Sequence, residues 1–351
     1  MNRLSAWIKS IHFLIGLQSK DETLPEVREI SIPIRNGSLR ADCYMAKSKS
    51  LGTIITINGL APLGNRDPRF IIVNRSLNRL GYTVVSPFYD EICDYKISLR
   101  NIEDIKDSIT YISKQKEISP SGKVSIFAPS FSGSLSLIAV SDKVIAERIN
   151  SVCAIGAFAN VDDVIGNLFA NQNLDEYGRM ILLLNFLPLS IGENKSLFKA
   201  IKLAILDNYF KYKDNLLEPY YSKMKKTDRE FFENLKYNKD FRMKHWEIIL
   251  KKGGKNRELL TALSVTNHID TLNLPILLIH GLKDDVVPAN ESYMLHEKLQ
   301  ARGVDCKLCI TNLISHGDTG FGFKTLFEVP KLISSFSYFF RKAYDGKLHC
   351  I

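Results

Sequence analysis

The sequence predicts an α/β fold with a mostly parallel central sheet and an inserted helical segment. Short apolar stretches alternate with segments of helical periodicity between residues 53 and 156, and the alternation resumes near residue 275. The intervening stretch is helix-like throughout. Strands that alternate with helices are typical of a parallel sheet whose functional residues gather at the carboxyl ends of its strands.

The elements are expected in the following order. Residues 27–35 and 39–45 alternate around Asn36-Gly37, which is a strong signal for a two-residue hairpin turn. The pattern then predicts strands at 53–58, 82–88, 124–127, 151–156, 275–279 and 306–312, and helices near 69–80 and 101–114.

Three regions follow from this pattern. We expect an N-terminal amphipathic helix or extension at 1–26, a core formed by 27–158 and 266–345, and a helical cap or lid inserted at 159–265. A helical cap over a catalytic site excludes water and shapes substrate choice. Substrate specificity is therefore expected to reside in the part of the chain that is hardest to interpret.

The N-terminal helix carries many apolar residues, but Lys9 and His12 interrupt them. The apolar run is too short and too charged to span a bilayer, and no small-residue cleavage site follows a continuous apolar core. Two interpretations remain. The sequence favours a helix that rests on the domain, and it leaves open one that lies loosely on a membrane surface.

The strongest functional signal is a serine between a strand and a helix. Ser130 follows an apolar strand and has small residues two positions on either side, Ala128 and Ser132. This pattern is typical of a sharp turn that presents a nucleophilic serine above a helix N-terminus. Ser132 also fits the pattern, but the third residue after it is the bulky Leu135, whereas the third after Ser130 is Gly133. The sequence therefore favours Ser130.

An acid and a histidine follow further along the chain, each after a predicted strand. Asp284 comes shortly after 275–279, and His316 comes after 306–312. Asp285 could replace Asp284 if the strand ended one residue later. The order serine, aspartate, histidine is the order found in α/β-hydrolases and differs from the orders in two other serine hydrolase folds.

On these motifs the chain resembles α/β-hydrolase fold proteins of the serine esterase, lipase or thioesterase kind over about residues 27 to 345. The resemblance implies that Ser130 is the nucleophile, His316 the general base and then acid, and Asp284 the group that orients the imidazole. It also implies an oxyanion hole made by the backbone amides of Leu60 and Phe131.

Two departures from the family pattern are visible. Ala128 and Ser132 stand where glycine is usual, and Asn58 stands where a histidine before glycine is common. The second departure matters less, because backbone amides supply the oxyanion donors in this fold.

The resemblance implies hydrolysis of a carboxylic ester or thioester through an acyl-enzyme, with a small-molecule acyl ester or thioester as substrate and no cofactor. An acyltransferase would use the same triad, and a non-catalytic binding protein could use the same fold. Amide cleavage is less favoured, because no peptide-binding feature is recognisable in the sequence.

Composition agrees with a globular enzyme. The 351 residues are 45% hydrophobic and 24% charged, and the six cysteines show neither zinc-ligand spacing nor a disulfide framework, so we expect reduced thiols and no metal. The net charge of +9 favours attraction of the protein to anionic surfaces, but no nucleic-acid-binding module is recognisable in the sequence. We expect a cytoplasmic protein with no nucleic-acid partner, and weak peripheral membrane contact is left open.

Overall fold

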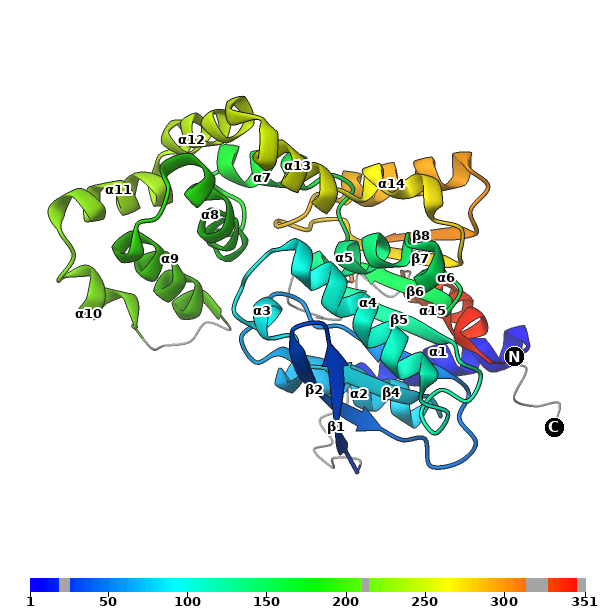
Figure 1. Ribbon diagram of the computed structural model, residues 1–351. Helices are drawn as coiled ribbons and strands as arrows, with labels where there is room; N and C mark the ends of the chain where they lie inside the picture. Colours follow the sequence, from blue (N-terminus) through cyan, green and yellow to red (C-terminus); the bar gives the residue numbers. More distant parts are fainter. Residues whose placement is uncertain (19–25, 210–214, 314–327, 346–351) are drawn as a thin grey trace. The chain divides into compact units, whose positions relative to one another are not determined.

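The computed structural model describes residues 1–18, 26–209, 215–313 and 328–345 (Figure 1). The chain divides into two compact units. Unit 1 comprises Met1–Ala159 and Ser264–Ile351, and unit 2 comprises Asn160–Leu263.

Unit 1 contains one eight-stranded sheet with the order β1-β2-β4-β3-β5-β6-β7-β8. The β1–β2 and β2–β4 pairs are antiparallel, and all other neighbouring pairs are parallel. The strands are β1 (Arg28–Ile34), β2 (Gly37–Tyr44), β3 (Thr53–Thr56), β4 (Thr83–Pro87), β5 (Val124–Pro129), β6 (Ile149–Ile155), β7 (Ile276–Gly281) and β8 (Cys306–Thr311). The prediction of a mostly parallel sheet is confirmed.

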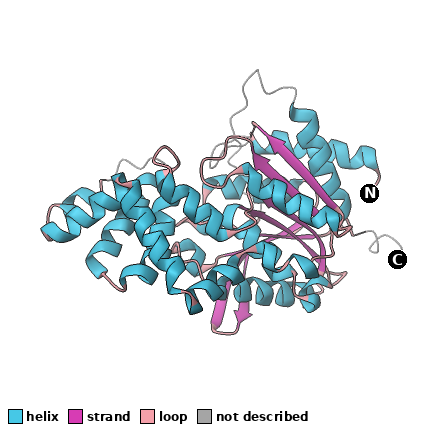
Figure 2. Cartoon of the chain, turned by 90° about the horizontal axis from the view of Figure 1, so that it is seen from above, coloured by secondary structure: helices cyan, strands magenta, loops and turns pink. Residues whose placement is uncertain are grey.

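Helices lie on both faces of this sheet (Figure 2). The helices of unit 1 are α1 (Arg3–Leu17), α2 (Pro68–Arg79), α3 (Asp90–Cys93), α4 (Leu99–Lys114), α5 (Ser130–Val140), α6 (Lys143–Ala146), α14 (Ala289–Ala301) and α15 (Val329–Ala343). Local sequence explains where they begin. For example, Asp67 caps α2 by accepting a hydrogen bond from the backbone amide of Arg69 at 2.9 Å, and Pro68 occupies the first helical position.

The main core cluster joins α1, α2 and α15 to one face of the sheet. Phe13 of α1 packs edge-on against Phe336 and Phe340 of α15 and against Phe127 of β5, with ring centroids 4.9 to 6.0 Å apart. Ile54 and Cys153 belong to the same buried cluster. Because side chains alternate along a strand, the neighbouring residues of β3 and β6 point to the opposite face.

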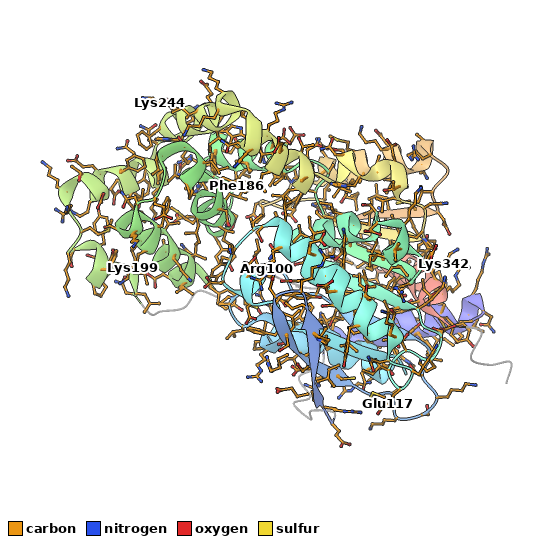
Figure 3. All side chains as sticks on the ribbon, viewed as in Figure 1. Arg100, Glu117, Phe186, Lys199, Lys244 and Lys342 are labelled. Atoms are coloured by element: carbon orange, nitrogen blue, oxygen red, sulfur yellow. The ribbon has the colours of Figure 1, made fainter. Side chains whose placement is uncertain are left out.

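Unit 2 is helical in the part that the structure describes. Its helices are α7 (Val161–Ala170), α8 (Glu176–Ile191), α9 (Lys195–Asn208), α10 (Leu217–Tyr221), α11 (Lys226–Tyr237), α12 (Lys239–Lys252) and α13 (Gly254–Leu263). Phe186 of α8, labelled in Figure 3, is fully buried there.

A fully buried arginine, Arg242 on α12, ties the helices of unit 2 together. Its guanidinium donates to the carbonyl oxygens of Phe169, Leu235 and Lys236 and to Oε1 of Gln172, at 2.9 to 3.2 Å. Burial, together with the nearby positive charge of Arg179, lowers the pKa of Arg242 to about 10. These bonds satisfy carbonyls at helix ends, which would otherwise be buried without partners.

No helix in the described ranges is long and apolar enough to cross a membrane. The functional role of 159–265 as a cap stays a prediction.

Candidate active site

Ser130 lies at the junction of β5 and α5 with a left-handed backbone, φ 55°. Tyr95 is the other described non-glycine residue with positive φ. The left-handed region costs an ordinary residue about 1 to 2 kcal/mol, so it persists only where the surrounding fold imposes it. This conformation is the one expected of a nucleophilic serine on a strand-to-helix turn.

The rival serine, Ser132, has a different environment. Its side chain is fully buried, and its hydroxyl donates a hydrogen bond to the carbonyl oxygen of Asn58 at 2.5 Å. Its φ does not fall in the left-handed region. These observations favour Ser130, which is half-buried, as the nucleophile and give Ser132 a structural role in fixing the end of β3.

Gly133 allows α5 to approach the sheet closely. A Cβ atom at this position would lie 3.0 Å from the carbonyl oxygen of Ala128 and 3.3 Å from Cβ of Ala154. The first contact is with backbone, which cannot move aside without shifting β5. A small residue is therefore needed three positions after Ser130, as the sequence suggested.

The predicted oxyanion loop lies next to Ser130. A Cβ built on Gly59 would lie 3.8 Å from Cβ of Ser130. Leu60 therefore directly follows a residue that lies next to the strand-to-helix turn. The Asn58 side chain donates to the carbonyl oxygen of Gly59 at 2.8 Å, which fixes the orientation of that peptide. Phe131 occupies the first turn of α5, where backbone amides have no acceptor within the helix.

Asp284 is held rigidly in the turn after β7. Its side chain is 5% exposed, and Oδ1 accepts hydrogen bonds from the backbone amides of Val286 and Val287 at 2.9 and 2.8 Å. Asp285, by contrast, is exposed. The geometry therefore favours Asp284 over its neighbour as the acid.

His280, on β7, contacts this turn. It is fully buried, and its Nε2 lies 2.8 Å from the carbonyl oxygen of Val287 and 3.6 Å from Oδ2 of Asp284. Because a carbonyl oxygen can only accept, Nε2 carries a proton and donates. The other ring nitrogen lies 2.6 Å from the hydroxyl of Ser292 on α14. His280 therefore positions the turn that carries Asp284.

Gly156 is a site residue that sequence reasoning missed. It follows β6 with φ +67°, and its amide donates to the carbonyl oxygen of Ile279 at 2.7 Å. A Cβ built on it would lie 3.5 Å from Oδ2 of Asp284 and 4.0 Å from Cα of Ser130. Ser130 and Asp284 therefore both lie close to one glycine. A glycine directly after a buried parallel strand was the available signal.

His316, the predicted third member of the triad, lies outside the described residues, so its role stays a prediction. Ser130, Asp284, Leu60 and Phe131 all belong to unit 1. No group of three or more metal-ligating side chains occurs among the residues that the structure describes. The described cysteines are free, and burial raises the pKa of Cys93 to about 12 and that of Cys43 to about 11.

Comparisons with solved structures identify the fold. The chain superposes on carboxyl esterase 2 from the fungus Tuber melanosporum with a TM-score of 0.53 at 13% identity, covering 93% of this chain and 89% of that one. It superposes on an esterase from Pyrobaculum calidifontis with a TM-score of 0.50 at 17% identity, covering 97% and 93%. For the acylaminoacyl peptidase of Pyrococcus horikoshii the TM-score is 0.51 at 15% identity, covering 94% of this chain and 44% of that one. The chain has the α/β-hydrolase fold.

A model of the prolyl oligopeptidase family matches residues 226–346. The chain spans 39% to 44% of the length of the acylaminoacyl peptidases that it matches. No curated protein sequence matches it.

Proposed function

We propose that this protein is a serine hydrolase that cleaves a carboxylic ester or thioester through an acyl-enzyme on Ser130. The observation that carries the proposal is the left-handed backbone of Ser130 at the β5–α5 junction. Its support comes from the neighbouring Gly59 and from a buried acid, Asp284, across Gly156. The α/β-hydrolase fold and the match to a serine peptidase family model agree with this class.

The proposed mechanism uses the same groups in both half-reactions. His316 removes the proton of the Ser130 hydroxyl, and the serine oxygen attacks the carbonyl carbon. The amides of Leu60 and Phe131 stabilise the oxyanion, and His316 returns the proton to the leaving alcohol or thiol. Water then attacks the acyl-enzyme by the same route. Asp284 orients the imidazole, and its own position is fixed by the amides of Val286 and Val287.

Peptide-bond cleavage is the second candidate, because the matching family model is of prolyl oligopeptidases and one structural relative is an acylaminoacyl peptidase. We favour an ester or thioester, since an alkoxide or thiolate is a better leaving group than an amide nitrogen. An acyltransferase would share the first half-reaction and differ only in its acceptor.

A fluorophosphonate probe tests the proposal directly. We expect labelling of the wild type that is lost in Ser130→Ala and His316→Ala and retained in Ser132→Ala. Turnover of p-nitrophenyl acyl esters and of peptide p-nitroanilides, measured in parallel, separates the two substrate classes. A folded wild-type protein that neither labels nor turns over either substrate would refute the enzyme assignment and favour a binding role.

A further inference from the structure

Helix α1 has two apolar faces, and only one of them is covered. Ala6, Phe13 and Leu14 are buried in the core of unit 1. A second set of large side chains recurs at intervals of three and four residues along the opposite side and is exposed. Its members, which we call the α1 stripe, are Leu4 (71% exposed), Trp7 (40%), Ile8 (46%), Ile11 (39%) and Ile15 (63%).

This exposure is unusual for the chain. Every other helix in the described ranges exposes at most one large hydrophobic side chain. Isolated exposed hydrophobic residues are ordinary, but a contiguous apolar stripe marks a surface that contacts something apolar.

A cationic cavity borders the α1 stripe. It has a volume of about 370 Å³, and it is formed by α1, β8 and α15 within unit 1. Trp7 belongs both to the stripe and to the cavity wall. The remaining lining residues are Arg3, Lys307, Ser334, Ser337, Tyr338 and Arg341, and they include no carboxylate.

The cations of this cavity are not neutralised by its walls. Nζ of Lys307 donates to the carbonyl oxygen and the hydroxyl of Ser334, at 2.9 and 2.7 Å. Burial lowers the pKa of Lys307, and the nearby Arg341 lowers it further. Nε of Arg341 is buried and has no hydrogen-bond partner in the part of the chain that the structure describes.

Asp305, two residues before Lys307, is not among the lining residues. Asp305 forms an ion pair of 2.6 Å with Lys342, which is labelled at the end of α15 in Figure 3. The cavity lining therefore combines three basic side chains with three hydroxyl groups, a composition suited to a phosphate-like anion.

We propose that the α1 stripe and the adjoining cavity form a docking surface for a membrane that carries anionic phospholipid headgroups. The stripe would enter the boundary between headgroups and acyl chains, with Trp7 at headgroup depth, and Arg3, Lys307 and Arg341 would receive a headgroup phosphate. Charge complementarity selects this occupant. A symmetric contact between two copies through the same face would bring two sets of cations together, which Coulomb repulsion opposes.

Trp7 gives a local readout of docking. The chain has two tryptophans, and the second, Trp246, is buried in unit 2. In a Trp246→Phe protein the fluorescence therefore reports on Trp7 alone. We expect a blue shift and co-sedimentation with vesicles of phosphatidylcholine and phosphatidylglycerol, weaker binding at high salt, and little binding to phosphatidylcholine alone.

Two double variants dissect the surface. Ile8→Ser with Ile11→Ser removes apolar contact and should weaken binding by about tenfold or more. Arg3→Gln with Arg341→Gln should weaken binding to anionic vesicles by about twenty-five-fold, which is roughly fivefold per cation, and leave binding to neutral vesicles unchanged. Lys143→Gln with Val144→Ser on α6, where both side chains are exposed, is the matched control and should bind as the wild type does.

Several results would overturn the proposal. These are an unchanged Trp7 emission with anionic vesicles, or equal binding to neutral and anionic vesicles. A dimer in sedimentation velocity without lipid, abolished by Ile8→Ser with Ile11→Ser, would assign the stripe to a second copy. The same Trp7 shift with inorganic phosphate alone would assign the cavity to a soluble anion. Thermal unfolding verifies that each variant is folded. The docking proposal does not depend on the proposed function.

Discussion

Replacing Gly133 by alanine tests how the nucleophile is positioned. The added Cβ would lie 3.0 Å from the carbonyl oxygen of Ala128 and 3.3 Å from Cβ of Ala154. The first distance is at the limit that real Cβ atoms adopt, and its partner is the backbone of β5. The helix must therefore move away from the strand, and Ser130, the first residue of α5, must move with it.

Two opposing terms set the size of the effect. Alanine favours a helix interior by about 1 kcal/mol over glycine, whereas overpacking a buried contact costs about 1 to 3 kcal/mol. We expect Gly133→Ala to lower the free energy of unfolding by about 1 kcal/mol, measured by urea denaturation. Because small displacements of reacting groups are costly, the rate of fluorophosphonate labelling should fall by about tenfold or more.

Gly166→Ala on α7 is the matched control. A Cβ there would meet Nε1 of Trp246 at 3.4 Å, which is ordinary contact, so the helix-propensity gain should appear without the steric cost. If Gly133→Ala stabilises the protein as Gly166→Ala does and labels at the wild-type rate, the argument for a close α5–β5 contact is wrong.

Three other predictions follow from the described contacts. Asp284→Asn should lower ester turnover by about three to four orders of magnitude. The asparagine oxygen can still accept from the two turn amides, but the amide nitrogen then replaces Oδ2 and cannot accept from the imidazole. Asp285→Asn should have little effect. Arg242→Met should destabilise unit 2 by about 3 kcal/mol, because it leaves buried helix-end carbonyls without donors. A variant as stable as the wild type in thermal unfolding would contradict this prediction. Cys43 and Cys93 should resist iodoacetamide at neutral pH in the native protein, because burial raises the pKa of both thiols; mass spectrometry showing rapid native labelling would contradict this.

The sheet could be predicted from the sequence because its signals are local. The Asn36-Gly37 turn predicts the β1–β2 hairpin, and the structure pairs Ile34 with Gly37 across it. The buried strands read as continuous apolar runs, as parallel strands do. The order of the strands in the sheet cannot be predicted from local sequence signals. That β4 lies between β2 and β3 depends on packing between distant segments.

Part of the candidate site could be predicted because a sharp strand-to-helix turn requires small residues near the serine. Gly133 distinguishes Ser130 from Ser132 in the sequence. The structure adds two observations that the sequence cannot contain: Ser130 has a φ of 55°, and the hydroxyl of Ser132 donates a hydrogen bond to the carbonyl oxygen of Asn58. The role of Gly156 could not be predicted from the sequence, because this residue lies near Ser130 and Asp284, which follow two other strands.

The N-terminal helix shows a different limit. A helix with apolar residues on two faces has no unique inward side, so its pattern favours resting on the domain without excluding a membrane surface. In the structure Phe13 packs against the aromatic residues of α15, which leaves Trp7 and Ile8 outward. The two interpretations are therefore compatible, since each uses a different face of α1.

Unit 1 alone supplies the described part of the candidate site, and this makes the roles of the two units separable. If the insertion governs substrate choice, as the sequence predicts, then variants of unit 2 should change KM among ester chain lengths while a small fluorophosphonate labels Ser130 at the wild-type rate. Arg242→Met is suited to this comparison, because the four hydrogen-bond acceptors of its guanidinium described above lie in unit 2. Equal loss of labelling and of turnover for every ester would instead mean that unit 2 is needed to form the site itself.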